Sequence, residues 1–282
     1  MEIEIICPLY NAEKYIKNLH TAIYKQKNVN IKKISYILTK SSDNTESILK
    51  ELVAEYTVLE KEEFSHSLSR ENIALKSESE ILVFITQDIE ITNDNWLYEL
   101  TLPIMENEAE AAFSRQISKY NNIEKYTREK NYPDSSYIVT KDNINQMGLK
   151  TFFFSDASSA IKTSTFKELK GYDSKKLPTS EDMYIAYKII TNGYRIKYCS
   201  KSIVYHSHNL TLKQLYKRYY DIGVFFKQND YLDSYGTNSA GGSLAKYILT
   251  RALKEKNIKV IINFVPNMVA RFMGMKMGRI NG

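Results

Sequence analysis

Short apolar runs alternate with amphipathic segments through the first 90 residues of this 282-residue chain. The run from Ile81 to Ile85 is unbroken, rich in β-branched and aromatic residues, and too short for a helix, which predicts a strand buried on both faces. Similar runs at 2–7, 34–38 and 56–59 are separated by segments with apolar residues at helical spacing. This alternation predicts an α/β fold with a doubly wound, mostly parallel sheet.

Beyond residue 90 the pattern is less regular. It predicts helices at 96–105, 163–169 and 211–226, strands at 111–118 and 152–160, a pair of strands within 195–205, and a polar surface excursion at 121–137. Another helix begins near Thr179, which we expect to be its N-cap in a capping box with Asp182. Asp43 is the expected N-cap of an earlier helix.

A Gly/Ser/Asn cluster predicts a flexible linker at 236–243, so we expect a first domain at 1–235 and a helical tail at 244–282. The tail has eight basic residues and one acid, Glu255, whereas the whole chain has a net charge of +6, so the first domain is close to neutral. Aliphatic and aromatic residues accompany these charges. That combination is typical of an interfacial helix on anionic lipid, and the alternative is a helix packed on the first domain with its lysines in solvent.

Composition narrows the functional classes. The apolar and charged fractions, 43% and 26%, are ordinary for a globular protein. Cys7 and Cys199 adjoin apolar strands and do not make a disulfide framework. We see no leader-like N-terminus and no apolar run of about 18 residues, the length that spans a bilayer. We therefore expect a cytoplasmic protein, and no nucleic-acid binding because the first domain is neutral and carries no recognition motif.

Polar residues that follow the predicted strands provide the candidate chemistry. Asp88 comes just after the buried run at 81–85, and ligands of open α/β sheets bind at the carboxyl ends of the strands. An ordinary loop turn is the alternative. Glu181 and Asp182 begin a helix, where the dipole alone favours acids. His206 and His208 follow the strands at 195–205.

Five stretches, taken in order over residues 2–230, resemble the inverting, nucleotide-sugar-dependent glycosyltransferases of family 2, which have the GT-A fold. Pro8 to Asn11 is similar to that family's P-x-Y-N, Ser42 to Thr45 to its S-T-D-G-T, Phe84 to Asp88 to its D-x-D region, Glu181-Asp182 to its E-D pair, and Val204 to His206 to its V-x-H. The closest likeness within the family is to bacterial rhamnosyltransferases, which move rhamnose from dTDP-rhamnose onto a lipid-linked or polysaccharide acceptor. The stretches that carry it include Phe64-Ser65-His66, Ser69-Arg70 and the segment at 214–223.

The resemblance and the chemistry of inverting glycosyl transfer together suggest roles for the candidate residues. Asp182 would be the general base, Asp156 and Glu181 would lie on the acceptor side, and Asp88 with His206 would bind Mn²⁺ or Mg²⁺ beside the diphosphate. His208 is a weaker candidate ligand. The nucleotide sugar would contact Pro8, Tyr10, Asn11, Thr39, Ser41, Asp43, Arg70, Gln87, Asp88 and Arg218. Because a helix dipole lowers the pKa of an acid at its N-terminus, burial or neighbouring charge must offset this effect if Asp182 is to act as a base.

The sequence departs from the family pattern at three positions. Thr86 stands where the family has the first Asp of D-x-D, Leu38 or Thr39 where an early Asp often reads the base, and Glu71 where Asn usually follows the arginine. Three functions therefore stay open. They are rhamnosyl transfer in bacterial surface-polysaccharide synthesis at the inner face of the cell membrane, transfer of another sugar (from UDP-glucose, UDP-galactose or a UDP-N-acetylhexosamine), and a catalytically silent GT-A subunit.

Overall fold

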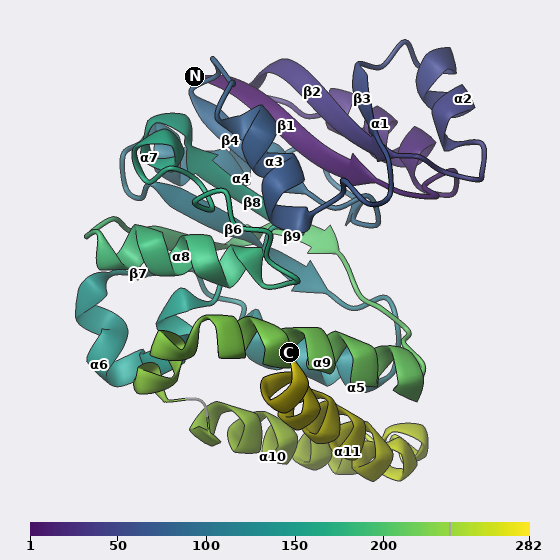
Figure 1. Ribbon diagram of the computed structural model, residues 1–282, viewed down its shortest axis with the longest axis vertical. Helices are drawn as coiled ribbons and strands as arrows, with labels where there is room; N and C mark the ends of the chain where they lie inside the picture. Colours follow the sequence, from purple (N-terminus) through teal and green to yellow (C-terminus); the bar gives the residue numbers. More distant parts are fainter. Residues whose placement is uncertain (237) are drawn as a thin grey trace.

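The computed structural model describes residues 1–236 and 238–282, with one central sheet, helices packed on it, and two further helices below (Figure 1). The strands are β1 (Glu2–Leu9), β2 (Asn30–Thr39), β3 (Tyr56–Leu59), β4 (Ile81–Ile85), β5 (Glu90–Ile91), β6 (Ala111–Ile117), β7 (Tyr137–Val139), β8 (Ser158–Lys162) and β9 (Ile196–Tyr205). The helices are α1 (Ile16–Tyr24), α2 (Thr45–Glu51), α3 (His66–Ala74), α4 (Trp96–Met105), α5 (Ile123–Asn131), α6 (Ile144–Met147), α7 (Thr163–Glu168), α8 (Glu181–Thr191), α9 (Leu212–Gln228), α10 (Asn238–Lys254) and α11 (Ile258–Asn281). The predicted α/β architecture with a C-terminal helical extension is confirmed.

The strands are ordered β3-β2-β1-β4-β8-β6-β9-β5 across the sheet, and β7 pairs with β9. The first four strands are parallel to one another, with Ile5 opposite both Ile34 and Val83. Strand β8 is antiparallel to β4 and β6, and the short strands β5 and β7 are antiparallel to β9. The sheet is therefore mixed: the doubly wound parallel part is the part built from the first 90 residues.

The side chains of β4 alternate between two apolar cores, because successive residues of a strand point to opposite faces of a sheet. Leu82 and Phe84 belong to the core under α3, α7 and α8, whereas Ile81, Val83 and Ile85 face α1, α2 and α4. All five side chains are fully buried. Burial on both faces is what the unbroken apolar run predicts.

Strand directions bring several chain segments to one edge of the sheet. Strand β4 ends just before Asp88, and β1, parallel to it, ends nearby at Leu9. Since β8 is antiparallel to both β4 and β6, while β9 is parallel to β6, strand β9 runs in the same direction as β4. It follows that His206 and Asp88 emerge at the same edge, and that β8 starts at this edge just after Asp156.

The prediction of an irregular polar excursion at 121–137 is wrong, since this segment contains α5 and the start of β7. Ile123 and Tyr126 of α5 are buried in a small core with Ile248, Ala252 and Val260 of the C-terminal helices. The rest of α5 is polar, so the sequence has no apolar stripe long enough to indicate a helix. Tertiary packing against the tail stabilises α5.

Two further local predictions are wrong. Strand β9 is one continuous strand rather than a pair of strands. Helix α8 begins at Glu181 with Ser180 as its N-cap residue, so Thr179 forms no capping box with Asp182. Ser180 has a left-handed backbone (φ 60°), a conformation that sequence-based capping rules do not anticipate.

The C-terminal tail is helical and packs on the rest of the protein. Helix α10 begins at Asn238, inside the predicted linker, while Thr237 lies outside the described residues. Helix α10 packs against α5, and α11 packs closely along α9 (Figure 1). Arg279 of α11 donates two hydrogen bonds of 2.7 Å to the Asp233 carboxylate. The tail is therefore packed on the first domain, which is one of the two alternatives that the sequence leaves open.

Helix α11 is long and apolar enough to cross a membrane by length and composition alone, although no continuous apolar run in the sequence predicts a span. Asn263, Asn267 and Arg271 interrupt its apolar residues. While one face contacts α9, a row of exposed apolar side chains lies at helical spacing on another. We call this row the α11 stripe: Ile258, Ile262, Val265, Val269, Phe272 and Ile280.

The close approach of α11 to α9 depends on glycine. A Cβ atom added at Gly278 would overlap the carbonyl oxygen of Tyr220. We expect Gly278→Ala to lower the free energy of unfolding by about 1–3 kcal/mol, the usual cost of overpacking, and to lower Tm. Gly241→Ala in α10 is the matched control, because a Cβ there meets nothing within 4 Å. Equal changes in Tm for the two variants would contradict this packing.

Candidate active site

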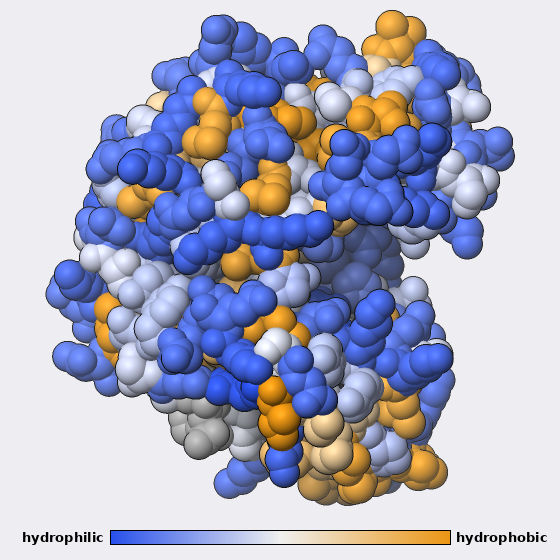
Figure 2. Space-filling model, in the orientation of Figure 1, coloured by the Kyte–Doolittle hydropathy of each residue, from blue (hydrophilic) through white to orange (hydrophobic). Residues whose placement is uncertain are grey.

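A cleft of about 730 Å³ lies at the edge of the sheet where β1, β4 and β9 end. Figure 2 shows it as the recess on the right, between the first strands and α9. Its volume is within the range of about 300–1,000 Å³ that is usual for small-molecule sites. The predicted site residues that line it are Pro8, Tyr10, Arg70, Gln87, Asp88, Asp156, Glu181, Asp182, His206 and Arg218.

Four predicted nucleotide-sugar residues lie outside the lining of this cleft: Asn11, Thr39, Ser41 and Asp43. Three of them hold loops together. The N–H of Asn11, which has a left-handed backbone (φ 47°), donates to Ser41 Oγ at 3.0 Å. Asp43 precedes the actual N-cap of α2, Asn44, and accepts the N–H of Thr45 at 3.1 Å. Burial opposes its charge, but hydrogen bonds led by that of the Thr45 hydroxyl hold the pKa of Asp43 below its ordinary value.

Asp88, His206 and His208 form a cluster that could hold a metal ion. Asp88 Oδ1 lies 3.6 Å from His206 Nε2, and Asp88 Oδ2 lies 3.6 Å from His208 Nδ1. Adjacent ligands of an octahedral ion, each about 2.1 Å from it, are about 3 Å apart, so a small side-chain adjustment would suffice. A carboxylate combined with imidazole nitrogens suits Mn²⁺ better than Mg²⁺. The donor set and its spacing fit a divalent ion.

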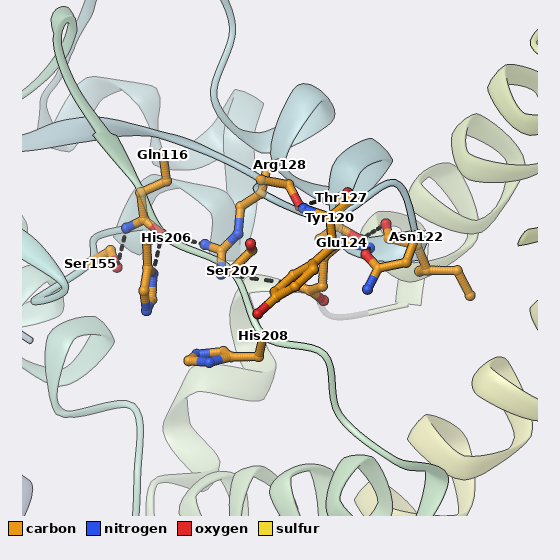
Figure 3. Close-up of polar contacts among 12 residues, drawn as sticks. Gln116, Tyr120, Asn122, Glu124, Thr127, Arg128, Ser155, His206, Ser207 and His208 are labelled. Atoms are coloured by element: carbon orange, nitrogen blue, oxygen red, sulfur yellow. Dashed lines mark hydrogen bonds and ion pairs between the residues drawn. The ribbon is translucent and has the colours of Figure 1, made fainter. Parts of the chain in front are cut away.

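The surroundings of His206 also fit this role. The ring is buried, and its Nδ1 lies 2.9 Å from Gln116 Oε1 (Figure 3). Burial, reinforced by the positive charge of Arg128, holds the pKa of His206 well below its ordinary value, so the ring is neutral. Neutral imidazole is the form that binds metals. Thr86, at the position of the missing Asp, has a buried hydroxyl without a hydrogen-bond partner among the described residues.

Gln87 joins two loops at the edge of the cleft. Its Oε1 accepts the N–H of Tyr10 at 2.7 Å, and its Nε2 donates to the carbonyl oxygen of Tyr10 at 2.9 Å. The Tyr10 ring stays exposed beside the cleft. Gln87 thus fixes the position of Tyr10, and its own amide is already engaged.

Arg70, predicted to contact the diphosphate, lines the cleft and is paired inside the protein. The side chain is buried, and its Nη1 donates to Glu181 at 2.9 Å and to the carbonyl oxygen of His66 at 3.0 Å. Burial opposes the charge of Arg70, but the Glu181 and Asp156 carboxylates raise its pKa above its ordinary value. Arg70 is therefore the internal counter-ion of a group of acids. Since Glu181 is 111 positions away along the chain, no local pattern could reveal this pairing.

Asp156, predicted to lie on the acceptor side, lines the cleft and is also engaged inside the protein. One carboxylate oxygen accepts the Ser159 hydroxyl at 2.7 Å, and the other accepts the Tyr172 hydroxyl at 2.8 Å. The residue is 2% exposed. Burial raises the pKa of Asp156 above its ordinary value, although the charge of Arg70 acts in the opposite direction.

Asp182 lies in the first turn of α8, half-buried in the wall of the cleft. Its Oδ1 accepts the N–H of Met183 at 2.8 Å. Burial, together with the nearby Glu181 and Asp156 carboxylates, raises the pKa of Asp182 well above that of an ordinary carboxyl group. These effects offset the lowering of the Asp182 pKa by the helix dipole, as a base at this position requires.

Helix α9 contributes residues to which sequence analysis gave no role. Gln214, Lys217 and Asp221 line the cleft together with the predicted Arg218. Their spacing of three or four residues puts them on one helix face. This polar face is the feature of the sequence that could have indicated their place in the cleft. Tyr15, Phe64 and His66 are likewise in the lining of the cleft.

The family described as glycosyl transferase family 2 matches residues 4–170, more than half of the chain. The chain belongs to glycosyl transferase family 2. This glycosyltransferase is 30% identical to the O-antigen chain rhamnosyltransferase WbaN of Salmonella anatum, an alignment that covers 98% of the chain and 88% of WbaN. It is 28% identical to the O-antigen chain rhamnosyltransferase RfbN of Salmonella typhimurium, with 99% and 90% covered.

Solved structures agree with this assignment at the level of the fold. The mannosyltransferase PcManGT of Pyrobaculum calidifontis, solved with GDP-Man and Mn²⁺, has a TM-score of 0.62 and 14% identity over 99% of this chain and 86% of PcManGT. Residues 1–349 of TarS from S. aureus, solved with UDP-GlcNAc, have a TM-score of 0.57 and 15% identity, with 99% and 92% covered. The glycosyltransferase therefore has the GT-A fold that the sequence resemblance implied.

Proposed function

We propose that this glycosyltransferase transfers rhamnose from dTDP-rhamnose, with inversion, to a lipid-linked or polysaccharide acceptor in bacterial surface-polysaccharide synthesis. The observation that carries the proposal is the single cleft in which Asp88, His206 and Asp182 all take part. The choice of rhamnose is supported by WbaN and RfbN, two O-antigen chain rhamnosyltransferases that align with nearly the whole chain.

Inverting transfer needs a base for the acceptor and a charge sink for the leaving group. In the proposed step, the Asp182 carboxylate takes the proton of an acceptor hydroxyl while that oxygen bonds to C1 of the sugar. The bond from C1 to the diphosphate oxygen breaks, and its electron pair leaves with the nucleoside diphosphate. Lys217 and Arg218 would bind the diphosphate from α9. A divalent ion held by Asp88 and His206, with His208 beside it, would supply further charge neutralisation there.

In this proposal Arg70 supports the acids and does not bind the donor. Its ion pair compensates the charge of Glu181, next to Asp182 in the first turn of α8. Without that compensation, Asp182 would lie beside an uncompensated carboxylate, whose repulsion would raise the pKa of Asp182 further. A protonated Asp182 could not act as a base.

Two alternatives keep the same fold. Transfer from UDP-glucose, UDP-galactose or a UDP-N-acetylhexosamine would use the same cleft, and the neighbours solved with GDP-Man and UDP-GlcNAc bind different donors. A catalytically silent subunit is favoured only by Thr86, which replaces an expected acid. The candidate base and the candidate metal ligands, all lining one cleft, favour an active enzyme.

A donor panel tests the proposal. Release of nucleoside diphosphate is measured with dTDP-rhamnose and with the three UDP-sugars, each with MnCl₂ or with EDTA. We expect the highest kcat/KM with dTDP-rhamnose and a dependence on Mn²⁺. Preference for a UDP-sugar would overturn the choice of donor. Binding of a donor seen as a thermal shift, without any turnover, would favour the silent subunit.

We further propose that the α11 stripe rests on an anionic membrane, as a peripheral contact at the inner face of the cell membrane. The exposed fractions of Ile262 and Phe272 are 70% and 66%. Hydrophobic residues gather on the surface over α11 in Figure 2, and Lys259 and Lys276 of the same helix are exposed. Apolar side chains accompanied by lysines are typical of interfacial helices, and a lipid-linked acceptor would make such attachment useful.

Liposome flotation tests the membrane contact. We expect the double variant Ile262→Glu/Phe272→Glu to reduce binding to anionic liposomes at least about tenfold, because each buried apolar side chain contributes about 1.5–3 kcal/mol. Val53→Glu is the control, since Val53 is a 90% exposed apolar residue of the first domain. Equal flotation of both variants and the wild type would contradict the proposal.

A further inference from the structure

We propose that Gln116 and Arg128 are positioning residues that fix the tautomer of His206, so that its Nε2 lone pair is presented to a divalent ion beside Asp88. The inference rests on the metal site of the proposed function and adds the residues that orient it. Neither residue belongs to a motif of the sequence analysis. Gln116 lies in β6 and Arg128 in α5, the helix that the sequence did not predict.

The hydrogen bonds around Gln116 are all formed inside the protein (Figure 3). Its side-chain Nε2 donates to Ser155 Oγ at 2.8 Å. Its Oε1 accepts from Arg128 Nη1, and the same oxygen lies 2.9 Å from His206 Nδ1. Gln116 is 1% exposed, so water does not compete for these partners.

The chemistry of arginine decides which atom carries the proton. A guanidinium has only donors, so the atom of Gln116 that faces Arg128 must be the oxygen. An amide oxygen only accepts, so His206 Nδ1, which faces the same oxygen, must carry a hydrogen. In the neutral ring the lone pair is then on Nε2, the nitrogen 3.6 Å from Asp88 Oδ1. The network thus selects the tautomer that can bind a metal together with Asp88.

Arg128 is itself held in place. Its Nη2 lies 3.5 Å from Glu124, one turn earlier in α5. Its guanidinium lies over the ring of Tyr132, 5.7 Å from the centroid. Arg271 of α11 lies near the other carboxylate oxygen of Glu124, also at 3.5 Å. Because α5 packs on the tail helices, the orientation of His206 depends on elements outside the sheet.

Metal binding without substrate provides the test. Mn²⁺ affinity is measured by titration calorimetry on the full chain, with and without dTDP, for the wild type and for Gln116→Met. We expect affinity to fall about 10–100-fold in Gln116→Met, the usual effect of removing the partner that orients a metal-binding histidine. Thr127→Ala, adjacent to Arg128 but outside the network, is the control and should bind Mn²⁺ like the wild type.

A rescue separates orientation from a general loss of structure. Arg128→Met frees the Gln116 amide to turn its NH₂ group toward His206, and affinity should fall. Adding Gln116→Glu to Arg128→Met leaves only acceptor oxygens at that position, so affinity should return to within about threefold of the wild type. In metal-free protein labelled with ¹⁵N-histidine, NMR should find the proton of His206 on Nδ1 in the wild type and on Nε2 in Arg128→Met.

Three results would overturn the inference. The first is Mn²⁺ affinity in Gln116→Met equal to that of the wild type, and the second is failure of the Gln116→Glu rescue while the protein stays folded. Both would leave the proposed metal site intact. The third is absence of Mn²⁺ binding to the wild type even with dTDP, which would also overturn the metal site. The donor panel tests sugar transfer separately from all of these.

Discussion

Asp182→Asn is expected to lower kcat by about 10²–10⁴-fold, the usual contribution of a general base. Asparagine has nearly the same shape but cannot take a proton from the acceptor hydroxyl. Affinity for the nucleotide sugar should change little, because Asp182 is placed on the acceptor in the proposed step. Steady-state kinetics combined with donor binding by calorimetry would measure both quantities.

The pH profile gives an independent reading of the same residue. The base works only when deprotonated, and its pKa is raised by burial and by the Glu181 and Asp156 carboxylates. The rate of the wild type should therefore fall, as the pH is lowered, at a higher pH than the ordinary pKa of a carboxyl group. This limb should be absent from the residual activity of Asp182→Asn.

The exposed acid Asp142 offers a control, and Asp142→Asn should leave both the rate and the pH profile unchanged. Full activity of Asp182→Asn in a folded protein would rule out Asp182 as the base.

Asp88→Asn has the second largest expected effect. Because an ion at the diphosphate contributes several kcal/mol of transition-state stabilisation and 1.36 kcal/mol corresponds to tenfold, we expect kcat/KM to fall about 10²–10³-fold. Mn²⁺ binding should be lost at the same time, since Asp88 is the carboxylate shared by both histidines of the cluster. The control is Glu90→Gln, an exposed acid two residues further along the chain.

The two substitutions should differ in a way that a general loss of structure would not produce. Asp182→Asn should keep Mn²⁺ and donor binding while losing the chemical step, whereas Asp88→Asn should lose Mn²⁺ binding as well. Turnover by Asp88→Asn at the wild-type rate in the presence of EDTA would exclude a metal at this position.

Much of the site was predictable because its residues adjoin the predicted elements. Asp88 follows the buried run of β4, His206 follows β9, and Asp182 lies in the first turn of α8. Strand periodicity and helix starts are local properties, so short patterns find them. A sheet with parallel strands then places polar residues at one edge.

Roles that depend on partners were not predictable in the same way. Arginine is a side chain that commonly binds phosphate, yet Arg70 is paired inside the protein with Glu181. Asp156 is occupied by the hydroxyls of Ser159 and Tyr172. In both cases the residue type indicated a polar site. The partner that pairs with the charge or hydrogen-bonds to the carboxylate could not be read from the local sequence.

Local patterns in the chain were enough to predict the parallel first half of the sheet, the membership of the chain in its family, and the residue types at the edge of the sheet. The antiparallel direction of β8, the helical state of α5 and the meeting of Gln116 and Arg128 at His206 became known from the folded protein alone. The physical reason is that apolar periodicity is set within one element, whereas strand direction, packing of a polar helix and hydrogen-bond partners are set by contacts between distant segments.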